Sequence, residues 1–574
     1  MSSQSGMNED PWHGVHPLLA RLYRARGARP EDLDYRLARL PSYADLRGIH
    51  AAVAVLADAL TRAERILVVG DFDADGATSC AVAVRGLRRL GAAAVDFLVP
   101  NRFEFGYGLT PEIVALAQQR GPDLLITVDN GISSVEGVRA ARAAGIRVVV
   151  TDHHLPGEHL PEADAIVNPN QAGCGFPGKA LAGVGVIFYV LLALRAHLRT
   201  QGWFGPSREE PNLAELLDLV ALGTVADVVP LDALNRILVT QGLQRMRAGR
   251  ACAGIRALAQ IAGRDLREVV AADLGYGIAP RLNAAGRLDD MSLGVRCLLT
   301  DDPAEAAGYA ATLDELNLER RALERRMHDE ALALVEDALI DGADLPAGLC
   351  LFDPGWHQGV VGIVASRIKD RTQRPVIAFA DCGDGELKGS GRSIPGVHLR
   401  DVLEAVATRH PTLLRRFGGH AMAAGLQLAA VDIERFSDAF VEAVAAACDA
   451  ARLGMATATD GALAPDDLVL PIAELLRSAG PWGQGFPEPV FEGEFEVVTV
   501  RVVGEVHLKL VLRAPGGQRT VEGIAFNAAA EAAIAAGSRA QVHYRLDVNR
   551  YRDARTLQLV IERLLPLPLC VENA

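Results

Sequence analysis

Three aspartates at alternate positions follow directly after an apolar run, and this arrangement restricts the fold more than any other stretch of the chain. The run, residues 66–70, has the length and the β-branched side chains of a buried strand. Asp71, Asp73 and Asp75 stand where that strand ends, followed by Gly76. Three carboxylates held together are costly unless cations neutralise them, and hard oxygen ligands suit Mg²⁺ or Mn²⁺ rather than zinc. Taken alone, an Asp-rich turn with a glycine explains the motif as well.

The same pattern occurs twice more downstream. Residues 124–128 form a second apolar run that ends in Asp129, and residues 146–150 form a third that leads to His153 and His154. In an open parallel sheet, ligands bind at the carboxyl ends of the strands. Three such strands therefore predict that these acids and imidazoles share one crevice, and that the crevice holds metal ions.

Helical patterns separate these runs, at residues 77–90, 111–120 and 135–144. Such alternation of strands and helices predicts a parallel, right-handed α/β sheet. Another predicted strand, residues 95–99, leads to Arg102, which would lie beside the crevice and clamp a phosphate. An ion pair with a neighbouring glutamate is the alternative for that arginine.

Three further polar residues stand in apolar surroundings. Asp227 has apolar residues on both sides, an unusual place for a carboxylate without a partner. We predict that it faces the metal ions, although a loop position at the end of a helix explains it too. Arg281 and Arg287 are candidates for substrate contact, and structural hydrogen bonding explains them equally well.

Composition limits the class of protein. At 574 residues the chain should hold three or four domains, because ~100–200 residues per domain is usual. Its eight cysteines include no Cys-x-x-Cys pair, which argues against a disulfide framework or a thiolate zinc site. The net charge of −14 gives no global attraction to polyanions, so any nucleic-acid contact requires a local basic groove.

The sequence lacks the pattern of a signal peptide or a membrane span. Its beginning is polar, without the apolar core of a signal peptide. The longest uncharged apolar run, residues 180–194, is shorter than the ~20 residues that cross a bilayer, so we expect a buried helix there. A reducing cytoplasm is the compartment that fits.

The second half of the chain begins with a long charged segment. Residues 304–340 contain no proline and are rich in Ala, Leu, Glu and Arg. They predict a helix of roughly 55 Å at 1.5 Å per residue. One interpretation is a solvated helix with ion pairs four residues apart. We favour the other interpretation, a strut that joins two lobes.

Glycine-rich segments with cations mark the next compact unit. Ser390 and Arg392 stand among glycines, and backbone N–H groups, a hydroxyl and a guanidinium together suit an anion. His420 follows the pair Gly418-Gly419, close to two arginines. Glycine-rich loops are also ordinary turns, so each is weak alone, and two in one domain favour phosphate contact.

In the last part of the chain, apolar and polar residues alternate with a period of two residues. Strand patterns occur at residues 507–513, 541–546 and 556–563, and short strands without helical crossovers predict a small β-barrel. Arg550 and Tyr551 lie at a predicted turn, where cations beside an aromatic ring suit stacking on single strands. An ordinary hairpin tip explains them nearly as well.

Four short motifs occur in an order that resembles the DHH phosphoesterase superfamily. They are Asp-Phe-Asp-Ala-Asp-Gly at residues 71–76, Val-Asp-Asn-Gly at 128–131, Thr-Asp-His-His at 151–154 and Gly-Thr-Val-Ala-Asp at 223–227. Longer runs at residues 101–108, 355–363 and 418–425 are similar to the bacterial members that degrade single strands. The resemblance covers nearly the whole chain.

The resemblance implies an α/β fold in which a long helix joins a parallel-sheet DHH domain to a DHH-associated α/β domain, followed by a small OB-like barrel. The segments expected are a helical N-terminal lead-in at 1–60, the DHH domain at 61–303, the connecting helix at 304–340, the DHH-associated domain at 341–450 and the OB-like single-strand-binding domain at 466–574. The activity implied is that of a 5′-to-3′ exonuclease specific for single-stranded DNA. Such an enzyme hydrolyses phosphodiester bonds by two-metal catalysis, releases 5′-mononucleotides, and acts in DNA recombination and repair.

The resemblance also assigns roles to individual residues. Catalysis is expected from Asp73, from Asp129 as a bridging carboxylate and from His154, which would face the scissile phosphate. Many members have a histidine where this chain has Val69, so Asp71 becomes the substitute ligand. The ligands implied for two divalent cations, Mg²⁺ or Mn²⁺, are Asp71, Asp73, Asp75, Asp129, His153 and Asp227. The substrate contacts implied are Arg102, Ser390 and Arg392 on the terminal 5′-phosphate, His420 on the nearby backbone, and Tyr107, Arg281 and Arg287.

Single-stranded DNA is the partner that the resemblance implies. A single-stranded-DNA-binding protein and a RecQ-type helicase are further expectations, and the chain is expected to be a monomer. Two rival functions stay open. A phosphodiesterase for cyclic dinucleotides or very short RNA shares the metal motifs but needs no residues beyond about 450. A non-catalytic scaffold for single strands would not need the acids and histidines.

Overall fold

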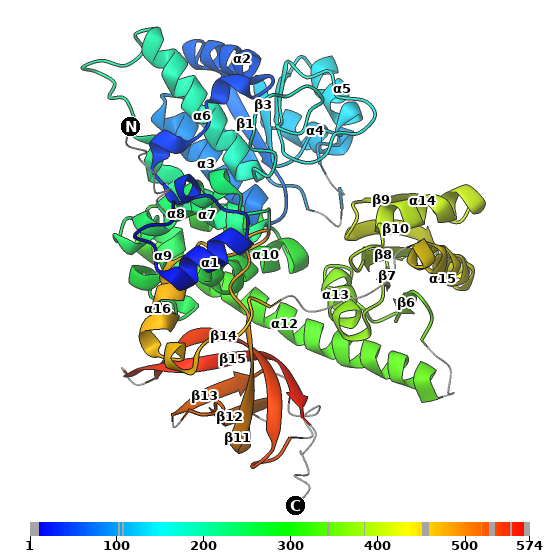
Figure 1. Cartoon of the computed structure of the whole chain (residues 1–574). Helices are drawn as coiled ribbons and strands as arrows, with labels where there is room; N and C mark the ends of the chain where they lie inside the picture. Colours follow the sequence, from blue (N-terminus) through cyan, green and yellow to red (C-terminus); the bar gives the residue numbers. More distant parts are fainter. Residues whose placement is uncertain are drawn as a thin grey trace, which may run out of the picture. The chain divides into compact units, whose positions relative to one another are not determined.

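The computed structural model describes residues 11–101, 104–105, 108–340, 345–383, 385–450, 459–504, 506–517, 519–526, 528, 534–551 and 554–567. The chain divides into two compact units (Figure 1). The first contains Met1–Leu282, Met291–Ala310 and Thr457–Ala574, and the second contains Asn283–Asp290 and Ala311–Ala456. The N-terminal segment and the last domain therefore belong to one unit, although they lie at opposite ends of the sequence.

A five-stranded sheet forms the centre of the first unit, with the strand order β2-β1-β3-β4-β5. Every neighbouring pair runs parallel, which confirms the predicted sheet. The register places Gly70 beside Val128, and Val128 beside Thr151, so three strands end level with one another. The strands are β1 (Arg65–Gly70), β2 (Ala94–Leu98), β3 (Leu124–Val128), β4 (Arg147–Thr151) and β5 (Ala165–Val167).

Helices cover both faces of this sheet (Figure 1). On one face, Val69 and Leu125 of the strands pack with Ile113 of α4 and Val138 of α5 in a buried cluster. The other face is covered by α2, α3 and α6. The five helices are α2 (Ile49–Thr61), α3 (Ala74–Arg89), α4 (Pro111–Gln118), α5 (Val135–Ala143) and α6 (Gly183–Thr200).

Helix α6 contains most of the apolar run at residues 180–194 and is a buried core helix, as predicted. Within the described residues it is the one helix long and apolar enough to cross a membrane, and 67% of that stretch is buried inside the protein. Because its surroundings are other apolar side chains of the first unit, core packing accounts for its composition.

A group of shorter helices follows α6, and all but the second half of α10 belong to the first unit. Helix α7 packs against both α3 and α8, and α11 packs against α3 and α9. One six-residue stretch, Asp273–Ile278, is π-helical and runs directly into α10. These helices are α7 (Leu217–Ala226), α8 (Ala233–Arg247), α9 (Ala253–Ile261), α10 (Ala279–Leu288) and α11 (Ser292–Leu299).

The N-terminal helix α1 (Pro17–Ala25) packs against the segment that precedes the last domain. The ring of Tyr23 stacks on those of Trp482 and Phe486, with centroids 6.0 and 6.1 Å apart. Arg26 donates two hydrogen bonds to the carboxylate of Asp460, at 2.8 and 2.9 Å. These contacts explain why the predicted lead-in and the last domain belong to the same compact unit. Three single-turn 3₁₀ helices, Pro30–Leu33, Leu37–Arg39 and Tyr43–Asp45, connect α1 to α2.

The last domain is a closed five-stranded barrel with the order β11-β12-β13-β15-β14, which confirms the predicted OB-like barrel. Strands β14 and β15 form a long hairpin, and Arg550 near its tip forms an ion pair with Glu268 of the first unit's helical part. A hairpin is therefore present at this segment, and stacking of its tip on single strands stays a prediction. The domain consists of α16 (Leu470–Ser478), β11 (Phe491–Val503), β12 (His507–Arg513), β13 (Thr520–Ala525), β14 (Arg539–Tyr551) and β15 (Ala554–Pro566).

The larger segment of the second unit begins within the predicted long helix, α12 (Pro303–Ile340), because a division between the units falls after Ala310. Arg320 pairs with Glu324 one turn later at 2.9 Å, and Arg367 reaches the same glutamate at 3.2 Å. Ion pairs thus account for part of the dense charge, and the helix also connects the two units.

The rest of the second unit is a mixed sheet with helices. Its strand order is β6-β7-β8-β10-β9, and β8 runs antiparallel to both of its neighbours. The elements are β6 (Leu349–Phe352), α13 (Val361–Thr372), β7 (Val376–Asp381), β8 (Glu386–Arg392), α14 (Leu399–Arg409), β9 (Arg416–Gly419), β10 (Ala423–Ala429) and α15 (Ile433–Ala450).

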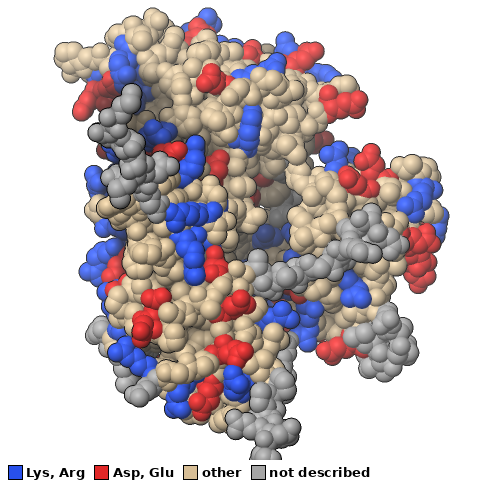
Figure 2. Space-filling view, in the orientation of Figure 1, with Lys and Arg blue, Asp and Glu red and all other residues tan. Residues whose placement is uncertain are grey.

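Acidic and basic side chains are interspersed over the face drawn in Figure 2. The net charge of −14 gives the chain no overall attraction to a polyanion. Any binding of phosphates must therefore depend on small clusters of cations.

Candidate active site

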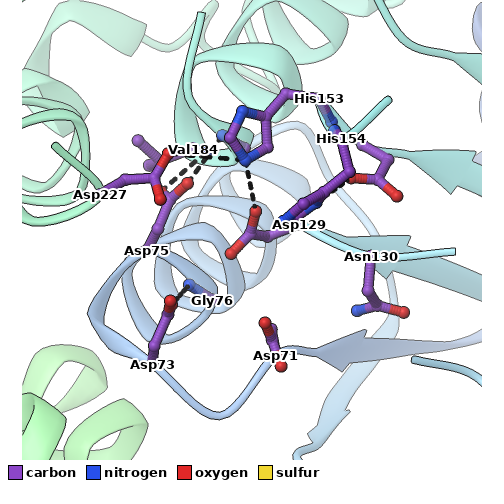
Figure 3. A network of polar contacts seen from close by, with 12 residues as sticks. Asp71, Asp73, Asp75, Gly76, Asp129, Asn130, His153, His154, Val184 and Asp227 are labelled. Atoms are coloured by element: carbon purple, nitrogen blue, oxygen red, sulfur yellow. Dashed lines mark hydrogen bonds and ion pairs between the residues drawn. The ribbon is translucent and has the colours of Figure 1, made fainter. Parts of the chain in front are cut away.

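The ends of β1, β3 and β4 place acids and imidazoles around one space (Figure 3). Because these strands end level with one another, the residues that follow them meet at one edge of the sheet. The structure brings together all six predicted metal ligands and His154. Their ligand atoms lie within 4.8 Å of one another in three groups, namely Asp71, Asp73 and Asp129; Asp75, His153 and Asp227; and Asp129, His153 and His154.

Asp129 is the most constrained of these acids. Its backbone φ of 61° lies in the left-handed region, which few residues other than glycine adopt, and its side chain is buried. Gly183, the first residue of α6, packs directly against it, since a Cβ atom there would lie 2.5 Å from Asp129 Oδ1. An unusual backbone angle and a gap that only glycine fits therefore hold this carboxylate in place.

Asp75 is held by the N-terminus of α6. Its two carboxylate oxygens accept hydrogen bonds from the backbone N–H groups of Gly183 at 2.7 Å and Val184 at 3.0 Å. Burial and then the negative charge of Asp73 raise the pKa of Asp75 to about 7, and the two backbone donors oppose that rise. A helix N-terminus favours an anion, so Asp75 links the acid cluster to the core helix.

His153 lies between two carboxylates, as the dashed lines in Figure 3 show. Its Nε2 atom is 3.1 Å from Asp129 Oδ1 and 3.5 Å from Asp227 Oδ2. Asp227 is the C-cap residue of α7. Burial and then the charge of Asp75 raise the pKa of Asp129 and of Asp227 well above the usual range of an aspartate.

Asp73 has a structural contact as well as a place in the cluster. It is the N-cap residue of α3, and its Oδ1 atom accepts a hydrogen bond from Gly76 N at 3.0 Å. The Asp-rich turn that explained residues 71–76 as a local structure is therefore present. It does not compete with the cluster, because the same turn directs the neighbouring acids toward β3 and α6.

Asp152 positions His154, a role that the sequence patterns did not predict. This buried carboxylate lies 2.8 Å from His154 Nδ1, and it also accepts hydrogen bonds from the backbone N–H groups of His154 at 3.1 Å and Ile132 at 2.9 Å. Burial lowers the pKa of His154, but the hydrogen bond and charge of Asp152 outweigh it and raise the pKa to about 9. The same contacts keep the pKa of Asp152 below its usual value in spite of burial.

The donor set fits divalent cations. Carboxylate oxygens with one imidazole are the ligands that Mg²⁺ and Mn²⁺ accept. Within the described residues, the buried Oδ2 atom of Asp227 has no hydrogen-bond partner. Burial first, and then the mutual repulsion of several carboxylates in one place, raises the pKa values of Asp75, Asp129 and Asp227. Cations would remove the repulsion.

Val69, at the position where the resemblance led us to expect a histidine, lies in the core of the first unit. Val69 is fully buried, and its side chain packs in the apolar cluster beneath α4 and α5. Its carbonyl accepts a hydrogen bond from Asn130 Nδ2 at 3.2 Å. Position 69 thus contributes to the core rather than to the acid cluster. Asp71, which directly follows β1, lies in the cluster with Asp73 and Asp129.

Two of the predicted substrate contacts lie side by side in the second unit. Arg392 Nη1 is 3.3 Å from Ser390 Oγ on the same strand, β8. Gly362, in the first turn of α13, packs on both, since a Cβ atom there would lie 2.7 Å from Ser390 Oγ and 3.1 Å from Arg392 Nη2. Burial lowers the pKa of Arg392, and no carboxylate of the described residues pairs with it. A buried cation, a hydroxyl and a helix N-terminus therefore adjoin one another.

Ser390, Arg392 and the N-terminus of α13 together form a group that we call the cradle, and two more candidates lie near it. Arg287 donates a hydrogen bond to Gly359 O at 3.1 Å, in the loop before α13. His420 is exposed in the turn between β9 and β10, and the register pairs Ala423 of β10 with Arg392. The structure thus places Arg287 and His420 at the same end of the sheet as the cradle.

The remaining substrate candidates are not brought to this cradle. Arg281 donates a hydrogen bond to Gly277 O and belongs to the first unit. Arg102 and Tyr107 lie outside the described residues. The roles of all seven candidate substrate contacts stay predictions.

Comparison with known proteins agrees with this geometry. The model of the DHH family, N-terminal domain, matches residues 65–224, the DHHA1 domain matches residues 346–446, and the RecJ OB domain matches residues 459–563. The single-stranded-DNA-specific exonuclease RecJ of Dickeya dadantii is 56% identical over 96% of both chains, and that of Escherichia coli is 53% identical over 96% of both chains.

The chain belongs to the RecJ family. A solved structure agrees with this assignment: RecJ from Thermus thermophilus in complex with Mn²⁺ superimposes with a TM-score of 0.76 at 35% identity, covering 96% of this chain and 76% of that one. The same protein has been solved in complex with Mg²⁺. Members of the RecJ family therefore bind the two cations that the carboxylate-rich donor set of this chain predicted.

Proposed function

We propose that this protein is a single-stranded-DNA-specific exonuclease that digests strands in the 5′-to-3′ direction and releases 5′-mononucleotides, in DNA recombination and repair. Its membership of the RecJ family makes it a metal-dependent exonuclease with divalent cofactors. The observation that carries the proposal is the convergence of six metal-ligating side chains and His154 at one edge of the parallel sheet.

The grouping of ligand atoms suggests how two cations would be held. Asp71, Asp73 and Asp129 would hold one cation, and Asp75, His153 and Asp227 the other. Asp129 would be shared, because it is close both to the first group and to His153 Nε2. Two cations supply Lewis-acid stabilisation of the attacking and leaving oxygens of an in-line displacement.

His154 would contribute a positive charge beside the reacting phosphate. With its pKa raised to about 9, the ring carries a proton at neutral pH. Asp152 fixes the orientation of the ring through Nδ1, and the protonated ring would stabilise the negative charge of a phosphate oxygen.

The cradle of Ser390, Arg392 and the N-terminus of α13 would bind the 5′-phosphate of the strand. Arg392 is buried without a carboxylate partner among the described residues, which is costly unless an anion is bound. The N–H groups at the start of α13 also favour an anion. Binding of a terminal phosphate would give the enzyme its preference for a 5′ end.

The barrel favours long strands over the rival substrates. A phosphodiesterase for dinucleotides would need no such domain, whereas OB folds bind single strands along a groove. A scaffold without activity would have no reason to bury mutually repelling carboxylates. We also infer a cytoplasmic location, action as a monomer, and contacts with a single-stranded-DNA-binding protein and a RecQ-type helicase, from the family alone.

A labelled digestion tests the proposed function. A strand labelled at its 5′ end should release labelled mononucleotide at once in Mg²⁺ or Mn²⁺, and a 3′-labelled strand should release it last. Asp129→Asn should lose cleavage in both metals while it still binds the strand. Asp438→Asn, which changes an exposed carboxylate of α15, should digest like the wild type. Wild-type cleavage by Asp129→Asn would contradict the assignment of the site.

A further inference from the structure

A second cluster of cations surrounds a pocket of about 320 Å³ in the first unit. The pocket lies where α3, α7, α8 and α9 meet, and its lining contains five arginines and three carboxylates. The charged residues are Arg85, Arg89, Arg245, Arg250, Arg256, Glu215, Asp218 and Asp301. Cations therefore exceed anions by two around this pocket.

Some of these charged residues form structural contacts in the wall of the pocket. Arg85 donates to the carbonyl oxygens of Leu298 and Leu299, at 3.0 Å each, and pairs with Asp301 at 2.9 Å. Arg256 donates to Ala251 O at 2.8 Å. These contacts hold α3 and α9 to the neighbouring loops. The donors of Arg85 and one donor of Arg256 are therefore already used within the protein.

Other arginine donors are buried and unused. Arg89 Nη1 lies 3.3 Å from a Glu215 oxygen but has no hydrogen-bond partner among the described residues. Arg245 Nε is also buried without a hydrogen bond, with the Asp218 carboxylate at 4.0 Å. A buried N–H group without an acceptor is costly, and an anion in the pocket would accept from both.

The carboxylate of Asp218 satisfies these donors only in part, because its Oδ1 atom lies 4.0 Å from Arg245 Nε and forms no hydrogen bond among the described residues. It is almost fully buried, and its Oδ2 atom accepts a hydrogen bond from Cys252 N at 2.7 Å. Cys252 is the N-cap residue of α9, and its side chain does not cap the helix. The first N–H groups of α9 thus lie beside the same pocket, where they favour an anion.

We propose that this pocket binds a phosphate group, supplied either by a free nucleotide or by a nucleic-acid strand. Guanidinium groups from two helices suit the tetrahedral oxygens of phosphate. The volume is larger than phosphate alone requires, and its charged lining suits a sugar-phosphate rather than an apolar ligand.

The pocket is separate from the metal site. Asp75 stands in the first turn of α3, whereas Arg85 and Arg89 stand near the other end of the helix, about 15–20 Å away at 1.5 Å per residue. Helix α7 runs in the other direction over about 14 Å at 1.5 Å per residue, with Asp218 in its first turn and Asp227 as its C-cap. A phosphate in the pocket cannot contact the acid cluster, but two helices join the sites.

Calorimetry on the full chain in EDTA tests the proposal, with inorganic phosphate, deoxyadenosine 5′-monophosphate and a short single-stranded oligonucleotide as probes. The double variant Arg245→Gln/Arg250→Gln should bind at least one probe about tenfold more weakly, because two charged donors are lost. The control Arg21→Gln/Arg139→Gln removes two exposed arginines outside the pocket and should bind like the wild type. The probe whose binding weakens in the double variant identifies the source of the phosphate.

A second variant separates this pocket from the cradle of the second unit. Arg392→Ala should leave the pocket's binding event intact, while the pocket variant should leave digestion of 5′-phosphorylated strands intact. Arg250 is exposed, so Arg250→Gln alone should keep the wild-type unfolding temperature and still weaken binding. Unchanged binding of all three probes to the folded pocket variants would overturn the proposal.

Discussion

At the scale of single residues, the site is an assembly of carboxylates whose charges the fold alone does not neutralise. Asp75, Asp129 and Asp227 are buried close to one another, and burial together with mutual repulsion raises the pKa of each. The fold tolerates this arrangement because backbone N–H groups of α6 donate hydrogen bonds to Asp75 and the ring of His153 lies against the carboxylate of Asp129. Cations would supply the rest.

The first prediction concerns stability without metal. An aspartate whose pKa is raised on folding takes up a proton on folding, so its unfavourable effect grows as the pH rises above about 4. In EDTA, Asp129→Asn should therefore unfold at a higher temperature than the wild type at pH 8, with a smaller difference near pH 4.5. Thermal unfolding at the two pH values measures this. Added Mn²⁺ should raise the unfolding temperature of the wild type more than that of the variant.

The second prediction concerns the 5′ end. Arg392→Ala should lower kcat/KM on 5′-phosphorylated strands by about 10–100-fold, because a charged hydrogen bond to the phosphate is lost. Strands with a 5′-hydroxyl should be digested at nearly the wild-type rate. Arg400→Ala, an exposed arginine of α14 in the same unit, is the matched control. Equal losses on both kinds of strand would contradict a role in end binding.

At the scale of elements, one helix start organises the metal site. The first residue of α6 donates to Asp75 through its N–H group, and its missing side chain makes room for Asp129. β3 supplies Asp129 in a left-handed conformation, and α7 supplies Asp227 at its C-cap. The positions of Asp75, Asp129 and Asp227 thus depend on how α6 and α7 pack against the sheet.

The third prediction tests that dependence. Gly183→Ala adds a methyl group 2.5 Å from Asp129 Oδ1 and should displace the carboxylate. A misplacement of about 1 Å costs roughly 100-fold in rate, and overpacking costs ~1–3 kcal/mol in stability. Single-turnover digestion and thermal unfolding report the two effects. In the control, Gly308→Ala, the new methyl group meets no neighbour within 4 Å, and activity should not change.

At the scale of the whole molecule, the N-terminal helix α1 contacts the residues that precede the barrel strands, within the same compact unit. Arg26 and Asp460 form a nearly buried ion pair, with side chains 6% and 13% exposed. The aromatic stack of Tyr23, Trp482 and Phe486 lies beside it. Deleting the barrel would therefore also uncover α1, so a point variant is the cleaner test of what the barrel contributes.

The fourth prediction uses this pair. Arg26→Ala should destabilise the protein by roughly 3 kcal/mol, because it leaves the Asp460 carboxylate without its partner. Limited proteolysis should cut the segment before the barrel sooner, and digestion of long strands should weaken more than that of very short ones. Arg21→Ala, an exposed residue of the same helix, should change neither measurement. An unaltered unfolding temperature in Arg26→Ala would contradict the role assigned to the pair.

The sequence by itself determined the local elements and the chemistry of the cluster. Apolar runs of strand length, each followed by acids or imidazoles, were sufficient to predict the parallel sheet and the gathering of these side chains at one edge of it, because the length of a strand and the residues that follow it are local features of the sequence. The full set of six ligands, with Asp227, was implied by the resemblance to the superfamily. The period-two pattern similarly predicted the barrel, and the composition of residues 304–340 predicted α12.

Only the tertiary structure decided the contacts between segments far apart in sequence. The support of Asp75 by α6, the packing of Gly183 on Asp129, and the pairing of Arg26 with Asp460 join residues more than fifty positions apart. The arginine pocket likewise gathers cations from three helices that show no shared pattern. Such contacts depend on helix packing in three dimensions, and no periodicity of one segment records which distant segment it will meet.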